Sequence, residues 1–173
     1  MKTRLASTLA AALLALAGTS FAQAAQISGA VGVTSQGDMT YRVGMSFDWD
    51  KKWLQSDVGY VSGYWDAAYT YWEGGEASAA HSLSFSPVFT YEFSGFTYTP
   101  YIEAGIGIAA FSKTDVGDQR LGSSFNFEDR IGFGVKLPGE QKVGVRAIHY
   151  SNAGIKEPND GIESYSLFYS KGF

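Results

Sequence analysis

The sequence predicts an all-β protein, an eight-stranded antiparallel transmembrane β-barrel with up-and-down topology. Apolar and polar residues alternate with a period of two through most of the chain, and helical periodicity is hard to find. The chain carries 12 Phe, 11 Tyr and 4 Trp, yet its mean hydropathy is only -0.08, as expected of barrel strands that alternate apolar and polar residues. Short and long connections also alternate between the expected strands. Aromatic richness would equally suit a soluble β-sandwich, so the composition alone does not decide.

Residues 1–24 are predicted to be a secretory signal peptide. Lys2 and Arg4 form a positive region, an apolar stretch follows at 5–17, and Ala22-Gln23-Ala24 offers a small-x-small cleavage pattern. No later segment has the roughly 18 uninterrupted apolar residues that a membrane helix needs. We therefore expect an exported protein whose residues 25–173 form one domain, the barrel.

The alternation defines eight candidate strands, at 26–34, 39–49, 53–72, 81–93, 97–111, 125–137, 141–152 and 162–173. The connections at 50–52, 94–95 and 138–140 are short, whereas those at 73–80, 112–124 and 153–161 are longer and polar. Short turns are typical of the periplasmic side of outer-membrane barrels. An even number of strands then places both termini in the periplasm.

One face of each strand carries polar and charged side chains of both signs among many Gly and Ser. In a soluble sandwich such faces would look outward, but in a narrow barrel they would fill the lumen. Eight strands leave room only for side chains or one small ligand, so a pore is disfavoured. We interpret the charged residues of this face as an internal ion-pair network: Arg42, Glu92, Glu103, Glu128, Arg130 and Arg146.

The last strand carries a targeting pattern. Phe173 ends the chain, and Tyr165, Leu167 and Tyr169 share its side of the strand. A terminal aromatic residue after alternating apolar positions resembles the signal by which outer-membrane barrels are assembled. We therefore expect the protein in the outer membrane. The 13 basic and 17 acidic residues argue against nucleic acid as a partner, and the absence of Cys excludes disulfides and thiolate metal sites.

Two histidines are present, and only one lies near residues with which it could act in catalysis. His81 stands where a loop meets a strand, and it is expected to be a loop or interfacial residue. His149 lies two residues before Ser151 on one strand, so both side chains point the same way with Cα atoms about 6.6 Å apart. An imidazole at that spacing can hydrogen-bond a serine hydroxyl and take its proton during attack on an ester.

The parity of the strands turns this pair toward lipid. His149 and Ser151 share their side with Val143 and Val145, and Glu163 shares the outward side of the last strand. Exposing polar groups to lipid costs free energy, so the presence of three of them on one outward stripe calls for an explanation. We assume a strand register in which His149 lies opposite Glu163. Ser151, His149 and Glu163 then lie next to one another in that order, at the height of the outer leaflet. The alternative is that these residues only contact lipid headgroups and cap the loop.

The same hairpin carries Arg146-Ala-Ile-His-Tyr-Ser-Asn-Ala-Gly154 followed by Asn159-Asp-Gly-Ile-Glu-Ser-Tyr-Ser-Leu-Phe-Tyr169. These two motifs resemble the C-terminal signature of the lipid A 3-O-deacylase family, outer-membrane esterases with a Ser-His-Glu triad. The resemblance extends to Tyr69-Thr-Tyr-Trp-Glu-Gly-Gly75, Tyr101-Ile-Glu-Ala-Gly-Ile-Gly107 and Asn126-Phe-Glu-Asp-Arg-Ile-Gly132. It implies Ser151 as nucleophile, His149 as general base and Glu163 as its orienter. It also suggests Asn152 and the backbone N–H of Gly154 as oxyanion-hole candidates.

The expected function is hydrolysis of the 3-O-linked hydroxyacyl ester of lipid A in the outer leaflet, without metal or cofactor. The expected partners are lipopolysaccharide as substrate and the surrounding outer-membrane lipid, and the barrel could form a homodimer. Two alternatives stay open at this point. One is a non-catalytic barrel that acts as an adhesin or structural anchor through its outer loops. The other is a different outer-membrane lipid enzyme, such as a phospholipase or acyltransferase.

Overall fold

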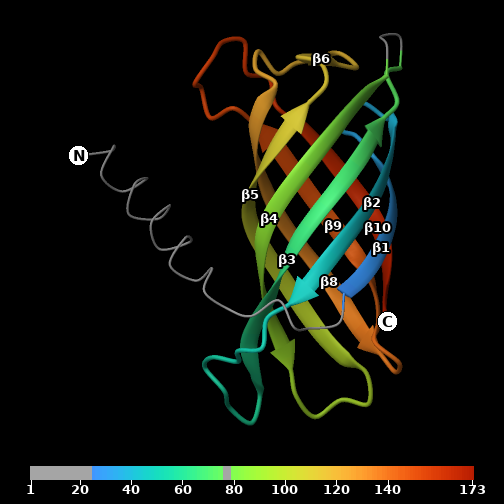
Figure 1. Cartoon of the computed structure of the whole chain (residues 1–173), viewed down its shortest axis with the longest axis vertical. Coiled ribbons are helices and arrows are strands. Elements are labelled where there is room, and N and C mark those ends of the chain that lie inside the picture. The colour runs from blue at the N-terminus through green and yellow to red at the C-terminus, as the bar shows by residue number, and fades with distance from the viewer. Residues whose placement is uncertain (1–24, 76–78) are drawn as a thin grey trace, which may run out of the picture.

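A computed structural model describes residues 25–75 and 79–173, and the predicted signal peptide lies outside these ranges. Eight antiparallel strands close into a barrel in the order β1-β10-β9-β8-β5-β4-β3-β2 (Figure 1). The barrel strands are β1 (Ala25–Val33), β2 (Met39–Asp48), β3 (Gly59–Trp72), β4 (Ala80–Phe93), β5 (Thr99–Phe111), β8 (Phe125–Leu137), β9 (Gln141–Ser151) and β10 (Ile162–Gly172). The predicted fold class is therefore confirmed. Among the described residues, no helix is long and apolar enough to cross a membrane.

The connections gather at two ends, which we call the loop end and the terminal end. Figure 1 shows the connections 34–38, 112–124 and 152–161 at the loop end, and the 49–58 and 138–140 connections at the other, where Phe173 also lies. At the loop end a small hairpin, β6 (Asp115–Val116) and β7 (Gln119–Arg120), stands inside the predicted 112–124 loop. Because β9 runs toward the loop end and β10 returns from it, the hairpin between them projects there.

The third strand is shorter than predicted. It begins at Gly59 rather than at residue 53, so the predicted short turn at 50–52 is part of a longer connection. Leu54 has a left-handed backbone (φ 50°), which interrupts an extended chain. Trp53 then folds back on β3 through two 2.8 Å backbone hydrogen bonds with Val61. The ring of Trp53 also packs edge-on against that of Trp49, with centroids 5.9 Å apart.

The outer wall of the barrel is apolar. Val43, Leu83 and Ile131 are 60%, 64% and 66% exposed, although each lies within a barrel strand. Similar outward side chains occur on the other strands, including Ile27, Val31, Ile102, Ile106, Phe133, Val145 and Leu167. A continuous surface of this kind is far larger than the apolar patches of soluble monomers, and it is the surface expected of a barrel in lipid.

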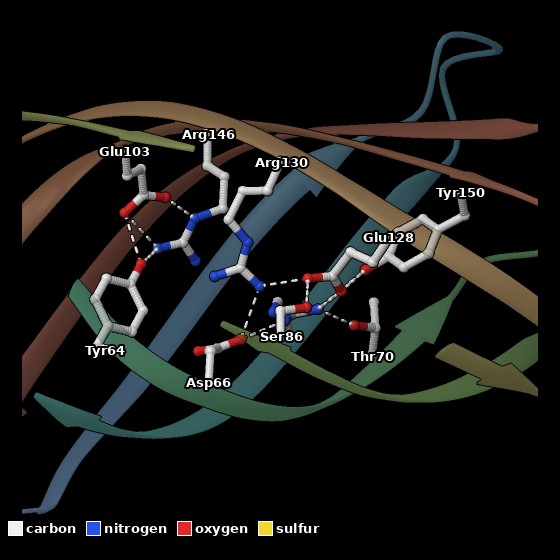
Figure 2. Close-up of polar contacts among 10 residues, drawn as sticks. Tyr64, Asp66, Thr70, Ser86, Glu103, Glu128, Arg130, Arg146 and Tyr150 are labelled. Atoms are coloured by element: carbon white, nitrogen blue, oxygen red, sulfur yellow. Dashed lines mark hydrogen bonds and ion pairs between the residues drawn. The ribbon is translucent and has the colours of Figure 1, made fainter. Parts of the chain in front are cut away.

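The lumen holds the predicted ion pairs in two adjoining groups (Figure 2). In one group, Arg42 and Arg130 share Asp66 at 2.6 and 2.7 Å, and both also contact Glu128. In the other, Arg146 pairs with Glu103, whose carboxylate also accepts a hydrogen bond from Tyr64. Glu92, the sixth predicted member, pairs instead with Lys136. Glycine makes room for this packing: a Cβ on Gly107 would lie 1.9 Å from the Oγ of Ser86.

Toward the loop end the lumen becomes apolar, which the simple polar-inside pattern did not predict. A buried cluster fills it, formed by Trp72, Ala80, Ala109, Phe111, Val116, Leu121, Ile148, Tyr150 and Ile162. The rings of Trp72, Phe111 and Tyr150 contact one another with centroids 5.3–5.5 Å apart. This cluster joins β9 and β10 to the small hairpin and fixes which residues of the last two strands can turn outward.

Candidate active site

His149 and Glu163 face each other on the last two strands. They are direct register partners in the β9–β10 ladder, as the sequence argument assumed. Their side chains meet in a 2.8 Å hydrogen bond between His149 Nδ1 and Glu163 Oε1. On β9, Ile148 and Tyr150 are buried in the lumen cluster, so His149 between them must point outward. The pair therefore lies on the outer wall near the loop end.

The bond to Glu163 sets the chemistry of the imidazole. A carboxylate accepts a hydrogen bond, so Nδ1 carries the proton and Nε2 is left as the basic nitrogen. The side chains of His149 and Glu163 are 42% and 31% exposed, so Nε2 is accessible from outside the barrel. Gly161 lets the chain pass close to the ring: a Cβ there would lie 2.7 Å from Cε1 of His149. The ring is thus held between a carboxylate and a glycine backbone.

Ser151 is the last residue of β9 and is half-buried on the same outward side. Among the described residues, its hydroxyl makes no hydrogen bond to His149. The Cα spacing of about 6.6 Å for residues two apart on a strand still lets a side-chain rotation bring Oγ to Nε2. Catalytic hydrogen bonds are often long or unaligned before the substrate binds. The structure thus brings His149 and Glu163 together and leaves Ser151 beside them.

Asn152, the first oxyanion-hole candidate, is fully buried. Its side-chain nitrogen donates to the carbonyls of Leu121 and Lys156, both at 2.7 Å. Its backbone N–H donates to Oδ1 of Asn159 at 2.9 Å. Both side-chain N–H groups are therefore occupied in this structure, and Asn152 ties the loop after β9 to the residues that follow β7.

Gly154, the second candidate, has a different environment. It adopts a left-handed backbone (φ 74°), as Ala153 does before it (φ 54°). Open space surrounds its Cα on the side where a Cβ would point. Within the part of the chain that the structure describes, its N–H has no acceptor. Of the two candidates, Gly154 is the one that offers a free donor beside Ser151.

The structure adds two polar residues that sequence reasoning missed. Asp129 on β8 is exposed and is the register partner of His149 on the side opposite Glu163. Its parity with Phe127 and Ile131 could have identified it as an outward acid. Ser35, in the β1–β2 turn, donates a 2.9 Å hydrogen bond to Oε2 of Glu163. Only the closure of the barrel brings it there, so no local pattern could have found it.

His81 does not join the site. It lies at the start of β4, where its Nδ1 is 2.6 Å from the hydroxyl of Tyr69 and its ring stacks on that tyrosine. Its register partner is Tyr71. It therefore belongs to an aromatic group on the outer wall.

An apolar groove begins directly beside the site. It has a volume of about 860 Å³ and crosses the outer wall from β3 to β10. Ala147 and Tyr165, which line it, are two residues from His149 and Glu163 on the side of the terminal end. Ile131 and Ala104 continue the same row across β8 and β5. The small side chains of the two alanines hollow the wall where larger residues would fill it.

Comparison with known protein families identifies the class of this site. Residues 35–171 match the model of the family described as Lipid A 3-O-deacylase (PagL). The chain belongs to the lipid A 3-O-deacylase family. It is therefore an enzyme of the ester hydrolase class, which confirms the resemblance seen on the last hairpin.

Two relatives and one solved structure agree with this membership, and a second solved structure agrees with the fold alone. Lipid A deacylase PagL of Pseudomonas aeruginosa is 69% identical over 149 residues, 86% of each chain. Lipid A deacylase PagL of Bordetella bronchiseptica is 39% identical and spans 73% of this chain and 66% of its own. The crystal structure of the outer membrane enzyme PagL superposes with a TM-score of 0.84 at 66% identity, covering 86% of this chain and 99% of that one. A de novo designed transmembrane β-barrel shares only the fold, with a TM-score of 0.54 at 9% identity over 87% of this chain and 95% of its own.

Proposed function

We propose that this protein hydrolyses the 3-O-linked hydroxyacyl ester of lipid A, with Ser151, His149 and Glu163 as its catalytic triad. The observation that carries the proposal is the 2.8 Å bond between His149 and Glu163 on a largely apolar outer wall, two residues from Ser151. The family to which the chain belongs and the names of its relatives supply the substrate. Neither metal nor cofactor is required for this chemistry.

The reaction follows the acyl-enzyme route of serine hydrolases. Ser151 Oγ forms a bond to the ester carbonyl carbon while Nε2 of His149 takes its proton. The tetrahedral intermediate collapses, the bond to the sugar oxygen breaks, and His149 returns the proton to that oxygen. A water molecule, deprotonated by the same nitrogen, then attacks the acyl-serine and releases the hydroxy fatty acid. Glu163 accepts the hydrogen bond from Nδ1–H and stabilises the imidazolium that forms during both acylation and deacylation.

The Gly154 N–H is the oxyanion donor that the geometry favours, because it stands free in the loop after Ser151. A preorganised backbone donor strengthens its bond as negative charge develops on the carbonyl oxygen. Asn152 could contribute only if its side chain released the carbonyl of Leu121 or Lys156. We therefore propose that Asn152 holds the loop in place and that the Gly154 N–H donates to the oxyanion of the tetrahedral intermediate.

The placement of the site suits a substrate that stays in the membrane. We propose that the termini lie in the periplasm and that the loop end faces outward, so that the triad opens sideways into the outer leaflet. The apolar groove would accommodate an acyl chain, since its walls are the side chains of strands that otherwise face lipid. Lipid A would then reach Ser151 by lateral diffusion, without leaving the leaflet.

The test is the mass of lipid A from cells that express the protein in an outer membrane. The wild type is expected to remove one hydroxyacyl group, and Ser151→Ala is expected to lose on the order of 10³-fold or more in rate. Ser94→Ala, an exposed serine at the terminal end, is the matched control and should behave as wild type. Unchanged lipid A with folded wild-type protein, or full activity in Ser151→Ala, would refute the proposal.

A further inference from the structure

We propose that Ser35 is a positioning residue that fixes the carboxylate of Glu163 for its role beside His149. The inference rests on the proposed function, because it extends the triad by one member. Ser35 does not touch the reacting atoms. It would act by holding Glu163, and through it the imidazole, in the orientation that proton transfer requires.

The barrel's closure creates the contact. β1 and β10 are register partners up to Val33 and Tyr165, two residues short of Ser35 and Glu163 respectively. The turn that follows β1 therefore lies beside the start of β10. Ser35 Oγ donates to Oε2 of Glu163 at 2.9 Å, while Oε1 of the same carboxylate lies 2.8 Å from Nδ1 of His149. The two oxygens are thus held from opposite sides of β10, one by the turn after β1 and the other by β9.

The turn that carries Ser35 is itself well fixed. Thr34 is buried, and its hydroxyl accepts hydrogen bonds from the backbone N–H groups of Gln36 and Asp38 at 3.3 and 3.1 Å. Its backbone N–H donates to the carbonyl of Asp38 at 2.8 Å, and its carbonyl accepts from Gly37 at 3.1 Å. Ser35 is therefore presented by an ordered turn, and little conformational entropy is lost when its hydroxyl engages Glu163.

A second donor matters more here than on a water-exposed surface. The outer wall around Glu163 is apolar, so the carboxylate has few alternative donors on the side of lipid, and an unbonded charged oxygen is costly there. A carboxylate bonded at one oxygen can also rotate and carry the imidazole with it. A neutral hydroxyl on the second oxygen limits that rotation and leaves the negative charge that stabilises the imidazolium.

The test compares variants of the full-length protein in detergent with purified lipid A as substrate. Ser35→Val removes the hydroxyl. Ser35→Thr retains the hydroxyl on a side chain of nearly the same shape as valine. We expect Ser35→Val to lower kcat by about three- to tenfold with little change in KM, and Ser35→Thr to stay within about twofold of wild type. Gln36→Ala, in the same exposed turn, is the control and should have wild-type kinetics.

A double-mutant cycle separates positioning from a general structural effect. In a Glu163→Ala background, Ser35→Val is expected to cause no further loss of kcat, because no acceptor for the Ser35 hydroxyl remains at that position. A loss as large as in the wild-type background would overturn the proposal, as would a silent Ser35→Val in the active enzyme. The comparison stays distinct from the proposed function: if Ser151→Ala kept its activity, the triad itself would fail whatever Ser35 does.

Discussion

At the residue scale, the site depends on side chains that cannot turn inward. Ile148 and Tyr150 are anchored in the apolar lumen cluster on either side of His149, and Ile162 anchors the residue before Glu163. The alternation of a strand then sends His149 and Glu163 to the outer wall. The polar pair is held there by packing in the lumen rather than by any favourable contact with lipid.

Gly161→Ala should impair catalysis without unfolding the barrel. Gly161 has a left-handed backbone (φ 72°), and a Cβ there would lie 2.7 Å from Cε1 of His149. The imidazole or the loop must shift, so we expect at least a tenfold loss of kcat/KM, since small misplacements of catalytic groups are costly. Gly95→Ala has a similar backbone penalty (φ 86°) with nothing within 4 Å and serves as the control. Equal effects of the two variants on activity would contradict the placement of His149.

Much of this site could be predicted from strand parity, and the remainder could not. Parity placed His149, Ser151 and Glu163 on one outward stripe, and it would also have placed Asp129 there. It says nothing of Ser35, which meets Glu163 only through the pairing of the first and last strands. Nor could it assign Asn152, since alternation ends with β9 and loop hydrogen bonds decide the orientation of that side chain.

At the element scale, the loop after β9 is braced by the loop that contains β6 and β7. Asn152 bonds the carbonyl of Leu121, and Asp160 bonds Arg120 through its backbone N–H at 3.1 Å and through its carboxylate. Trimming residues 112–124 would therefore be a poor way to separate an adhesin from an enzyme. Both kinds of protein would lose function, because the loop supports the chain that carries Gly154.

Gly122→Ala tests this brace directly. A Cβ at Gly122 would lie 2.0 Å from the carbonyl oxygen of Pro158, which is backbone and cannot move alone. We expect the two loops to separate and the deacylation rate to fall by about tenfold or more, while the barrel keeps its folded, heat-modifiable migration on electrophoresis. Gly139→Ala, with similar φ at the terminal end and no contact closer than 3.5 Å, should retain its rate. A Gly122→Ala variant as active as Gly139→Ala would show that the brace does not position the site.

At the scale of the whole molecule, the barrel is polar in one part of its lumen and apolar in another. The ion pairs around Asp66 and Glu128 occupy the first part, and the cluster around Trp72 fills the second. The period-two pattern predicted the closed barrel and five members of the two ion-pair groups. It could not predict the apolar part: parity sends Ile148 and Ile162 inward, but it does not show that Val116 and Leu121 of the 112–124 loop enter the lumen to meet them. The shortened β3 was missed because the left-handed backbone of Leu54 bends the chain there, and no residue pattern marks that conformation.

Glu128→Gln should act mainly on the stability of the barrel and less on the geometry of the candidate active site. Glu128 is completely buried and contacts Arg42, Arg130, Ser86 and Tyr150. Removing its charge leaves two buried guanidinium groups with one remaining partner carboxylate, so the free energy of unfolding should fall by about 3–5 kcal/mol. Arg120→Gln, which breaks the exposed pair with Asp160, should cost about 1 kcal/mol or less. Urea unfolding in lipid vesicles measures both, and comparable losses would contradict the claim that the buried network stabilises the barrel.

We propose that Ser151, on the outer wall, is the nucleophile of this ester hydrolase. Labelling with an alkyl fluorophosphonate tests it most directly, because this reagent forms a stable bond to an activated serine. We expect one adduct per protein, located by peptide mass mapping on Ser151, with activity lost in proportion to labelling and no labelling in His149→Ala. Loss of activity with the label on another residue, or full activity with Ser151 labelled, would contradict it.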